Sequence, residues 1–504
     1  MEGSLDTLKE ENTLENHYLN YAKDSSIIAV AQIIISLLLF LRLPLLTKCL
    51  GAYLYGTWSI IWVTITLAAS LATLGLNSAV VRFLAPEKDV AEIRQGFLST
   101  VVAVFGAGLL CCIILILFSV FFAKSILLDK SAIHLIQLSS LMIITQALTQ
   151  IGIAFFRTFR QIKWYSSLLV GKATLELSLI VCLLMIDWKL IGIITAILTS
   201  DIVFIFIIFL LVFKQIGFEI PRFTRLMSYL RYGLPLMPSS AILWITHFSD
   251  RYIIGYFMEA KEVGIYSAAY ALSNILVIFI SPLQVTLLPT ISKSYQEGDK
   301  DRTEVYLNYS WKFLIMLAIP AVFGISIMAV PLLSTLTTSE FINGSSVIPL
   351  IASGILFYSL YQVCIHIFYL VNKTSWILSI LGLASVFNVG LNLLLVPRFG
   401  IVGAGVANML ANGLVAILTV YISFKYYKFN LNLGFIIKSA IASSLMALTI
   451  WFLNPTKIYQ IITSILLGII IYTVLLLALK GIDKNEFRFL KNLVMGFNTA
   501  GNKY

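Results

Sequence analysis

The sequence is dominated by apolar runs, each long enough to cross a lipid bilayer. A membrane-spanning helix needs about 20 predominantly apolar residues, and runs of this length recur along all 504 residues. Only 12% of the residues are charged, about half the share of a soluble domain. We therefore predict an all-α integral membrane protein of about fourteen transmembrane helices, near residues 25–47, 54–80, 97–122, 132–156, 164–186, 190–213, 233–258, 264–291, 309–330, 346–371, 375–396, 400–424, 433–453 and 458–479.

The Lys and Arg residues indicate how these spans are oriented. Of the 35 in the chain, 23 lie in the termini and alternate loops that share a side with the N-terminus, seven lie in the opposite loops, and five lie within spans. Because basic loops stay in the cytoplasm, we predict a multi-pass protein of the cell (inner or plasma) membrane with both termini cytoplasmic. The segment 1–24 and the tail 480–504 are then cytoplasmic, and the net charge of +11 reflects topology rather than nucleic-acid binding.

An internal repeat relates the two halves of the chain. Three pairs of identical residues align when the first half is moved forward by 208 positions: Ala52 with Ala260, Gly56 with Gly264, and Ser59 with Ser267. Each repeat holds six spans, so both copies enter the membrane in the same direction and form two parallel bundles around a central cavity. The predicted units are a bundle at 25–213, a cytoplasmic linker at 214–232, a bundle at 233–424, and two further spans within 433–479.

Two segments resemble a known family of transporters. The segment "YGLPLMPSSAILWITHFSDRYIIGYFMEAKEVGIYSAAYAL", residues 232–272, resembles the seventh-span region of O-antigen-translocase-like (Wzx-type) polysaccharide-transport flippases. "NLLLVPRFGIVGAGVAN", residues 392–408, is similar to the start of their twelfth span. The family belongs to the multidrug/oligosaccharidyl-lipid/polysaccharide exporter superfamily. The resemblance implies alternating-access transfer of a polyprenyl-pyrophosphate-linked oligosaccharide from the cytoplasmic to the outer leaflet, for cell-surface polysaccharide or glycan biosynthesis.

Three cations within spans are candidates for binding the pyrophosphate of such a lipid: Arg42, Lys172 and Arg251. An ionisable group in the membrane is costly unless it is paired or hydrated, so it commonly marks a pathway. Two phosphates in a poorly hydrated cavity would require positive charge nearby. Arg82, Arg157 and Arg160, at the ends of spans, are interpreted instead as topology determinants.

Asp250 and Arg251 are neighbours near the outer end of the seventh span. Because neighbours on a helix point about 100° apart, one is expected to face the cavity and the other an adjacent helix or the headgroups. The alternative is that both extend to the outer interface. Arg42 aligns with Asp250 in the repeat, so we predict that these two form a gating pair when the cavity is closed to the outside.

Two carboxylates are candidates for ion coupling. Glu176 lies four residues after Lys172, on the same helix face, and Asp201 lies near the middle of the sixth span. A carboxylate in a low-dielectric site suits coupling to H⁺ or Na⁺. The alternative is a structural ion pair that neutralises a buried charge.

Other functions fit the sequence less well. A membrane polysaccharide polymerase or glycosyltransferase would carry a large catalytic loop or domain, so we expect a non-enzyme with no cofactor. An ATP-driven pump would need a G-x-x-x-x-G-K-[ST] motif, which is absent. A multidrug exporter of the same superfamily remains an alternative. The expected partners are membrane lipids, the lipid-linked oligosaccharide, and a polymerase and glycosyltransferases, with no nucleic acid.

Overall fold

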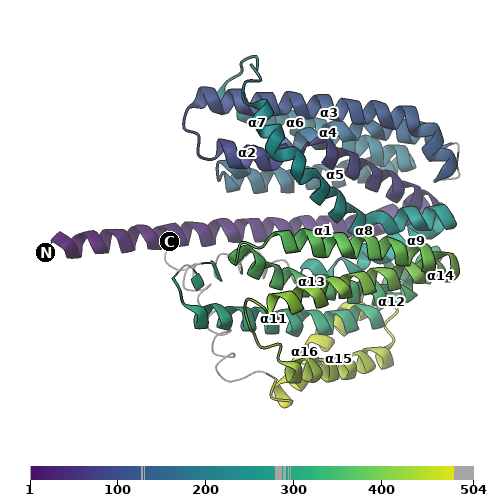
Figure 1. The fold of residues 1–504 in the computed structure, drawn as a ribbon. Coiled ribbons are helices and arrows are strands. Elements are labelled where there is room, and N and C mark those ends of the chain that lie inside the picture. The colour runs from purple at the N-terminus through teal and green to yellow at the C-terminus, as the bar shows by residue number, and fades with distance from the viewer. Residues whose placement is uncertain are drawn as a thin grey trace.

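The computed structural model describes residues 2–481 apart from 127–128, 130, 279–286, 288–290, 293 and 296. Within that part the chain is helical, without strands. Figure 1 shows one group of helices formed by α2 to α6 and a second formed by α9 to α14, with the start of α1 running between them. α15 and α16 lie against the second group. We call α1–α6 the N-lobe and α8–α14 the C-lobe.

The helices of the N-lobe are α1 (Glu2–Ala72), α2 (Leu76–Leu84), α3 (Val90–Ser125), α4 (Ala132–Thr158), α5 (Ile162–Met185) and α6 (Lys189–Ile216). The linker continues into α7 (Leu226–Gly233) and the short helix η1 (Leu234–Leu236). The C-lobe contains α8 (Met237–Phe257), α9 (Ala260–Ser273), α11 (Lys300–Ile327), α12 (Ala329–Leu336), η2 (Ser339–Ser346), α13 (Ile348–Leu370) and α14 (Ser375–Ser423). The last two helices are α15 (Leu433–Leu453) and α16 (Ile458–Ala478).

Ten helical stretches in the described residues are long and apolar enough to span a membrane. Two of them, Ser26–Leu84 with 59 residues and Ser375–Ser423 with 49, have more than twice the length of about 20 residues that one crossing needs. Each is broken by a glycine of positive φ, Gly51 at 70° and Gly400 at 59°, a conformation that a side chain would disfavour. The all-helical, multi-pass membrane fold is therefore confirmed. The predicted span 264–291 lies partly outside the described residues.

The two lobes meet closely at the end of the molecule that contains Gly51, which we call the kink end. Here α1 crosses α9 with small residues at the contact: a methyl group added to Gly56 would lie 1.7 Å from the Ala260 carbonyl oxygen, and one added to Gly264 would lie 2.0 Å from that of Ala52. Such small residues allow two helix backbones to approach. The kink end is therefore closed by backbone contact.

Residues related by the predicted repeat touch each other at this crossing. The hydroxyls of Ser59 and Ser267, which are 208 positions apart, hydrogen-bond at 2.7 Å. A contact between equivalent residues of two copies is the arrangement expected beside a two-fold axis. A two-fold repeat of the predicted kind would produce this contact.

Polar contacts further tie the lobes together at the kink end. The Glu340 carboxylate of η2 accepts a hydrogen bond from the Ala52 backbone N–H at 2.9 Å, and Lys48 donates to the Thr335 carbonyl at 3.0 Å. Carboxylates are favourable at the start of a helix because free N–H groups and the helix dipole both attract negative charge. Opening this end would break both contacts.

At the opposite end, which we call the linker end, residues 217–233 are fastened to the N-lobe. Arg225 forms ion pairs with Glu87 at 2.9 Å and Glu92 at 3.2 Å. Arg94 pairs with Glu219 at 2.7 Å. We call these five residues the linker network. All of these ion pairs join the linker to the N-lobe.

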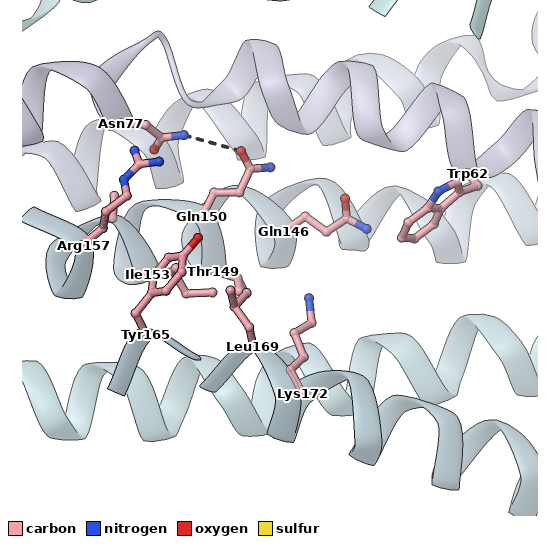
Figure 2. Close-up of a pocket in the computed structure, with 11 residues that line it drawn as sticks. Trp62, Asn77, Gln146, Thr149, Gln150, Ile153, Arg157, Tyr165, Leu169 and Lys172 are labelled. Carbon is pink, nitrogen blue, oxygen red and sulfur yellow. Dashed lines mark hydrogen bonds between the residues drawn. The ribbon is translucent and has the colours of Figure 1, made fainter. Parts of the chain in front are cut away.

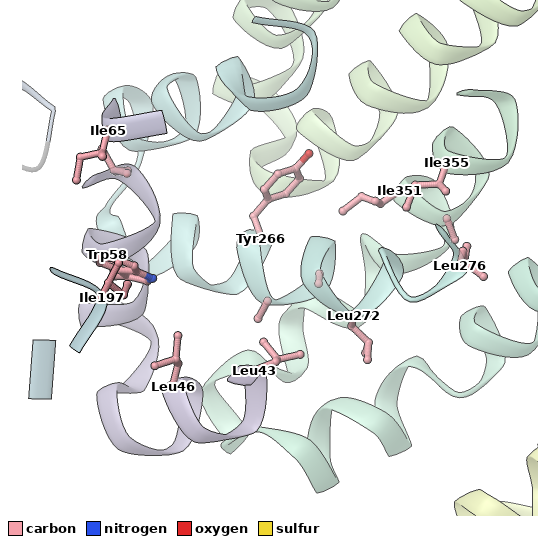
Figure 3. Packing of buried hydrophobic residues seen from close by; sticks show 14 of the residues in the cluster. Leu43, Leu46, Trp58, Ile65, Ile197, Tyr266, Leu272, Leu276, Ile351 and Ile355 are labelled. Carbon is pink, nitrogen blue, oxygen red and sulfur yellow. The ribbon is translucent and has the colours of Figure 1, made fainter. Parts of the chain in front are cut away.

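The apolar core passes from one lobe to the other through α1. Figure 3 shows Leu43, Leu46 and Trp58 of α1 among buried side chains of both lobes. Many large apolar side chains remain exposed on the outer helices, such as Leu117 at 74%. A lipid environment accounts for these because it does not penalise apolar surface.

Candidate functional site

Two ion pairs lie within the N-lobe. Arg42 of α1 pairs with Glu176 of α5, and its guanidinium lies 5.7 Å from the ring centres of both Trp58 and Trp62. Lys172 of α5 pairs with Asp201 of α6 at 2.5 Å. Lys172 and Glu176 share a helix face as predicted, yet each pairs with a residue of a different helix.

Asp201 is fully buried, and its second oxygen accepts a hydrogen bond from Thr145 at 2.8 Å. The carboxylate is therefore held by two neighbouring helices, α4 and α5. This arrangement compensates the Lys172 charge and fixes its position.

The third pair, Asp250 with Arg251, lies inside the C-lobe. Arg251 donates to Asp250 at 2.7 Å and to the His247 carbonyl at 2.7 Å. Its guanidinium stacks 4.1 Å from the ring centre of Tyr270, and Tyr266 donates to the other Asp250 oxygen at 2.5 Å. The expectation that the two charges point to different surroundings is wrong, because the long arginine side chain folds back onto its neighbour.

The predicted gating pair, Arg42 with Asp250, is not formed in this structure, although the kink end is closed. Arg42 is held by Glu176 in the N-lobe, while Asp250 is held by Arg251 and Tyr266 in the C-lobe. Each of the two residues has a partner within its own lobe instead. Both side chains are already compensated by shorter-range contacts.

A pocket of about 420 Å³ lies in the N-lobe, lined by residues of α1, α2, α4 and α5. Figure 2 shows Tyr165, Leu169 and Lys172 projecting from α5 toward α4. Trp62 lies at one end of the pocket, next to the Arg42 guanidinium. The volume falls in the lower part of the range of small-molecule sites, roughly 300–1,000 Å³. Of the three predicted substrate-binding cations, only Lys172 lines this pocket; Arg42 stacks on its Trp62, and Arg251 is buried in the other lobe.

The opposite wall of the pocket is rich in amides. Asn77 of α2 donates to Gln150 of α4 at 3.5 Å, and Gln146 lies one turn before Gln150. Arg157, in the last turn of α4, also lines the pocket. The interpretation of Arg157 as a topology determinant alone missed this position. The signal was the polar stripe formed by Gln146, Gln150 and Arg157 along one face of an otherwise apolar span.

A second, larger pocket of about 1010 Å³ lies between the C-lobe and the last two helices. Its lining is almost wholly apolar and includes Phe40 of α1, Met316 of α11, Met446 of α15 and Ile461 of α16. The molecule therefore offers a polar pocket within the N-lobe and a larger, apolar one beside the C-lobe.

Solved structures of transporters share this fold. A structure of the lipid II flippase MurJ in an inward closed conformation superposes with a TM-score of 0.75 at 17% identity, covering 88% of this chain and 97% of that one. An inward-facing MATE-family multidrug transporter of the MOP superfamily gives 0.64 at 16% identity, covering 79% of this chain and 97% of that one. At such identities the likeness describes the fold alone.

Curated relatives match part of the chain. A probable low-salt glycan biosynthesis flippase, Agl15 of Haloferax volcanii, is 24% identical over 278 residues, 54% of this chain and 59% of that protein. A probable lipid II flippase, MurJ of Haemophilus influenzae, is 23% identical over 283 residues, 50% of this chain and 54% of that protein. The chain thus spans little more than half the length of these relatives.

Family models match two overlapping segments. The MatE model matches residues 235–394, and the model described as polysaccharide biosynthesis protein matches residues 21–295, more than half of the chain. Residues 235–394 contain Asp250 and Arg251, which lie in the segment that resembles the flippase family. Residues 21–295 contain every residue that lines the N-lobe pocket. The chain therefore belongs to the polysaccharide biosynthesis protein family.

Proposed function

We propose that this protein is a flippase that moves a polyprenyl-pyrophosphate-linked oligosaccharide from the cytoplasmic to the outer leaflet by alternating access. The observation that carries the proposal is the presence of a polar pocket in the N-lobe together with a larger, apolar pocket beside the C-lobe. A lipid-linked glycan has the same two parts, a polar head and a long apolar chain. The polar pocket has two cations and no carboxylate in its lining, which disfavours a cationic drug as the substrate.

In this proposal the linker end faces the cytoplasm and the kink end faces outward, as the distribution of basic residues predicts. The head would enter the N-lobe while the chain lies along the apolar pocket. The contact of Ser59 with Ser267 then forms part of the outer closure. Separating the lobes here would release the head to the outer leaflet.

Ion coupling in this proposal acts through Asp201 or Glu176. A proton or Na⁺ that neutralised Asp201 would free Lys172 for a new partner, and neutralisation of Glu176 would do the same for Arg42. Either change would redistribute charge beside the pocket. A polymerase and glycosyltransferases are the proposed partners, since the glycan must be supplied on one side and consumed on the other.

A reversible cross-link tests the proposal. A variant without its native cysteines, carrying Ser59→Cys and Ser267→Cys, is reconstituted in vesicles with a fluorescent lipid-linked oligosaccharide. Because the two hydroxyls lie 2.7 Å apart, oxidation is expected to join the cysteines and stop translocation, and reduction should restore it. The single-cysteine variants are the controls. Translocation that continues in the fully cross-linked protein would contradict alternating access through this end.

A further inference from the structure

One wall of the N-lobe pocket consists mainly of side-chain amides rather than charged groups. Asn77, Gln146 and Gln150 line one wall. A side-chain amide has both donors and an acceptor, as a sugar hydroxyl does, whereas a fully ionised diphosphate only accepts hydrogen bonds. The composition of this wall therefore matches a carbohydrate better than it matches a diphosphate.

Two of these amides have hydrogen-bonding capacity that the protein leaves unused. Gln146 is only 8% exposed, and its side chain makes no hydrogen bond to any residue that the structure describes. The Oδ1 atom of Asn77 is buried and has no hydrogen-bond partner in the same part of the chain. A buried polar group without a partner is destabilising. The Asn77 oxygen needs a donor, which a hydroxyl or an amide N–H supplies and a phosphate does not.

The charges beside the pocket also favour an uncharged group along the amide wall. Lys172 is already compensated by Asp201. Arg157 lines the pocket at its linker end and forms no ion pair among the described residues. An anionic group would therefore be attracted to the Arg157 end, and an uncharged group would be accepted between Gln150 and Trp62.

Trp62 gives the pocket a fixed aromatic wall. Its ring lies 5.4 Å from that of Trp58, and the Arg42 guanidinium lies 5.7 Å from its centre. Arg42 is held in turn by Glu176. A tryptophan fixed in this way presents a large apolar face with little entropy left to lose, which suits the C–H face of a sugar ring.

From these observations we propose that the amide pocket binds an uncharged sugar ring of the glycan, with Gln146 and Asn77 as specificity-determining residues. The diphosphate lies outside the amide wall, at the Arg157 end. This inference rests on the proposed function. It goes further by separating the residues that recognise the sugar from the residue that meets the anion.

The test compares two probes: farnesyl diphosphate, and farnesyl diphosphate linked to N-acetylglucosamine, in which the sugar replaces one ionisable oxygen of the terminal phosphate. Binding to the full chain in lipid nanodiscs is measured by calorimetry. Wild type is expected to bind the sugar-bearing probe about tenfold more tightly, and Gln146→Leu to remove that advantage while leaving farnesyl diphosphate unchanged. Arg157→Gln should weaken both probes. Gln137→Leu is the matched control because Gln137 lies on the same helix but bonds to Ser119 of α3.

The outcomes separate the two hypotheses. If wild type binds both probes equally, or if Gln146→Leu weakens both to the same extent, the sugar assignment is wrong although the proposed function survives. If wild type binds neither probe, both fail. Should Gln146→Leu not fold, as judged by its melting temperature, Asn77→Leu provides the same comparison and the same outcomes decide it.

Discussion

Each of three cations within the spans is matched by a carboxylate. The pairs are Arg42 with Glu176, Lys172 with Asp201, and Arg251 with Asp250. An uncompensated charge in the membrane costs several kcal/mol, so pairing explains how these residues are tolerated. It also means that none of the three cations is free for an anion until its pair is broken.

The Lys172–Asp201 pair leads to a prediction about stability. Asp201→Asn leaves the Lys172 ammonium without its counter-ion in a largely buried site, and we expect a loss of about 3 kcal/mol in the free energy of unfolding. Replacing both residues, Lys172→Met with Asp201→Leu, should recover most of it because no charge remains buried. Thermal unfolding in detergent measures both. Equal instability of the single and double variants would show that the charge is not the cause.

A charge exchange distinguishes the observed partner of Arg42 from the one predicted by the repeat. Arg42→Glu with Glu176→Arg should regain part of the transport lost in Arg42→Glu alone, because the pair is reversed rather than removed. Arg42→Glu with Asp250→Arg should not, since Asp250 lies with Arg251 in this structure. The assay is translocation in vesicles at matched insertion. Rescue by the Asp250 variant alone would restore the gating-pair hypothesis.

The sequence identified which residues would be buried ions but not their partners. Ionisable residues within apolar spans are conspicuous because burial is costly, so Lys172 and Asp201 could be predicted as site candidates. Their pairing depends on which helices become neighbours, and the i,i+4 spacing of Lys172 and Glu176 favoured a different pair. Gln146 was missed because an uncharged amide is an inconspicuous residue in a span.

At the scale of the helix, the closest contact between the lobes is the crossing of α1 and α9. Gly56 and Gly264 allow the backbones to touch, so any side chain there must separate the helices. The crossing therefore sets how tightly the kink end closes. The sequence aligned these glycines with each other but gave no indication that they meet.

Gly56→Ala should open this crossing. The added methyl group would lie 1.7 Å from the Ala260 carbonyl oxygen, so the helices must move apart. We expect a cysteine at position 267 to react faster with a membrane-impermeant maleimide added from outside, roughly several-fold given the closeness of the clash. Gly106→Ala is the control, because no atom lies within 4 Å of its added methyl. Unchanged labelling in Gly56→Ala would show that the crossing does not limit access.

The linker network predicts how the attachment of the linker to the N-lobe depends on pH. A hydrogen bond from Arg225 lowers the pKa of Glu87, and one from Gln95, with the Arg94 charge nearby, lowers the pKa of Glu219. A carboxylate whose pKa is lower in the folded state stabilises that state above its unfolded pKa, about 4.3 for Glu. The contribution is lost as the pH falls through the lowered value. The linker should therefore loosen below about pH 4.

A spin label at Ser228→Cys reports this loosening, because Ser228 is exposed on α7. Its mobility should rise when the pH on the linker side falls from 7 to 3.5, and Glu87→Gln should show raised mobility already at pH 7. Glu262→Gln, on α9 at the kink end, is the control. A label equally immobile in Glu87→Gln at both pH values would contradict a role for this network.

At the scale of the whole molecule, two helical lobes are joined by a linker, and ion pairs fasten this linker to one of them. Apolar runs were sufficient to predict most of the spans, because bilayer thickness imposes their length. The direction in which they cross, inferred from loop charge, stays a prediction. Hydropathy could not reveal that the polar pocket lies within one lobe, since that depends on how α4 and α5 pack. The residues of an apolar run do not indicate which other helices they contact.

The hydrogen bond between Ser59 and Ser267 has a consequence for how such a chain could arise. A surface that meets its own counterpart across a two-fold axis is self-complementary. A protein of half this length would already present that surface to a second copy and could pair as a homodimer. Duplication and fusion of its coding sequence would then conserve that interface, leaving each half to specialise afterwards.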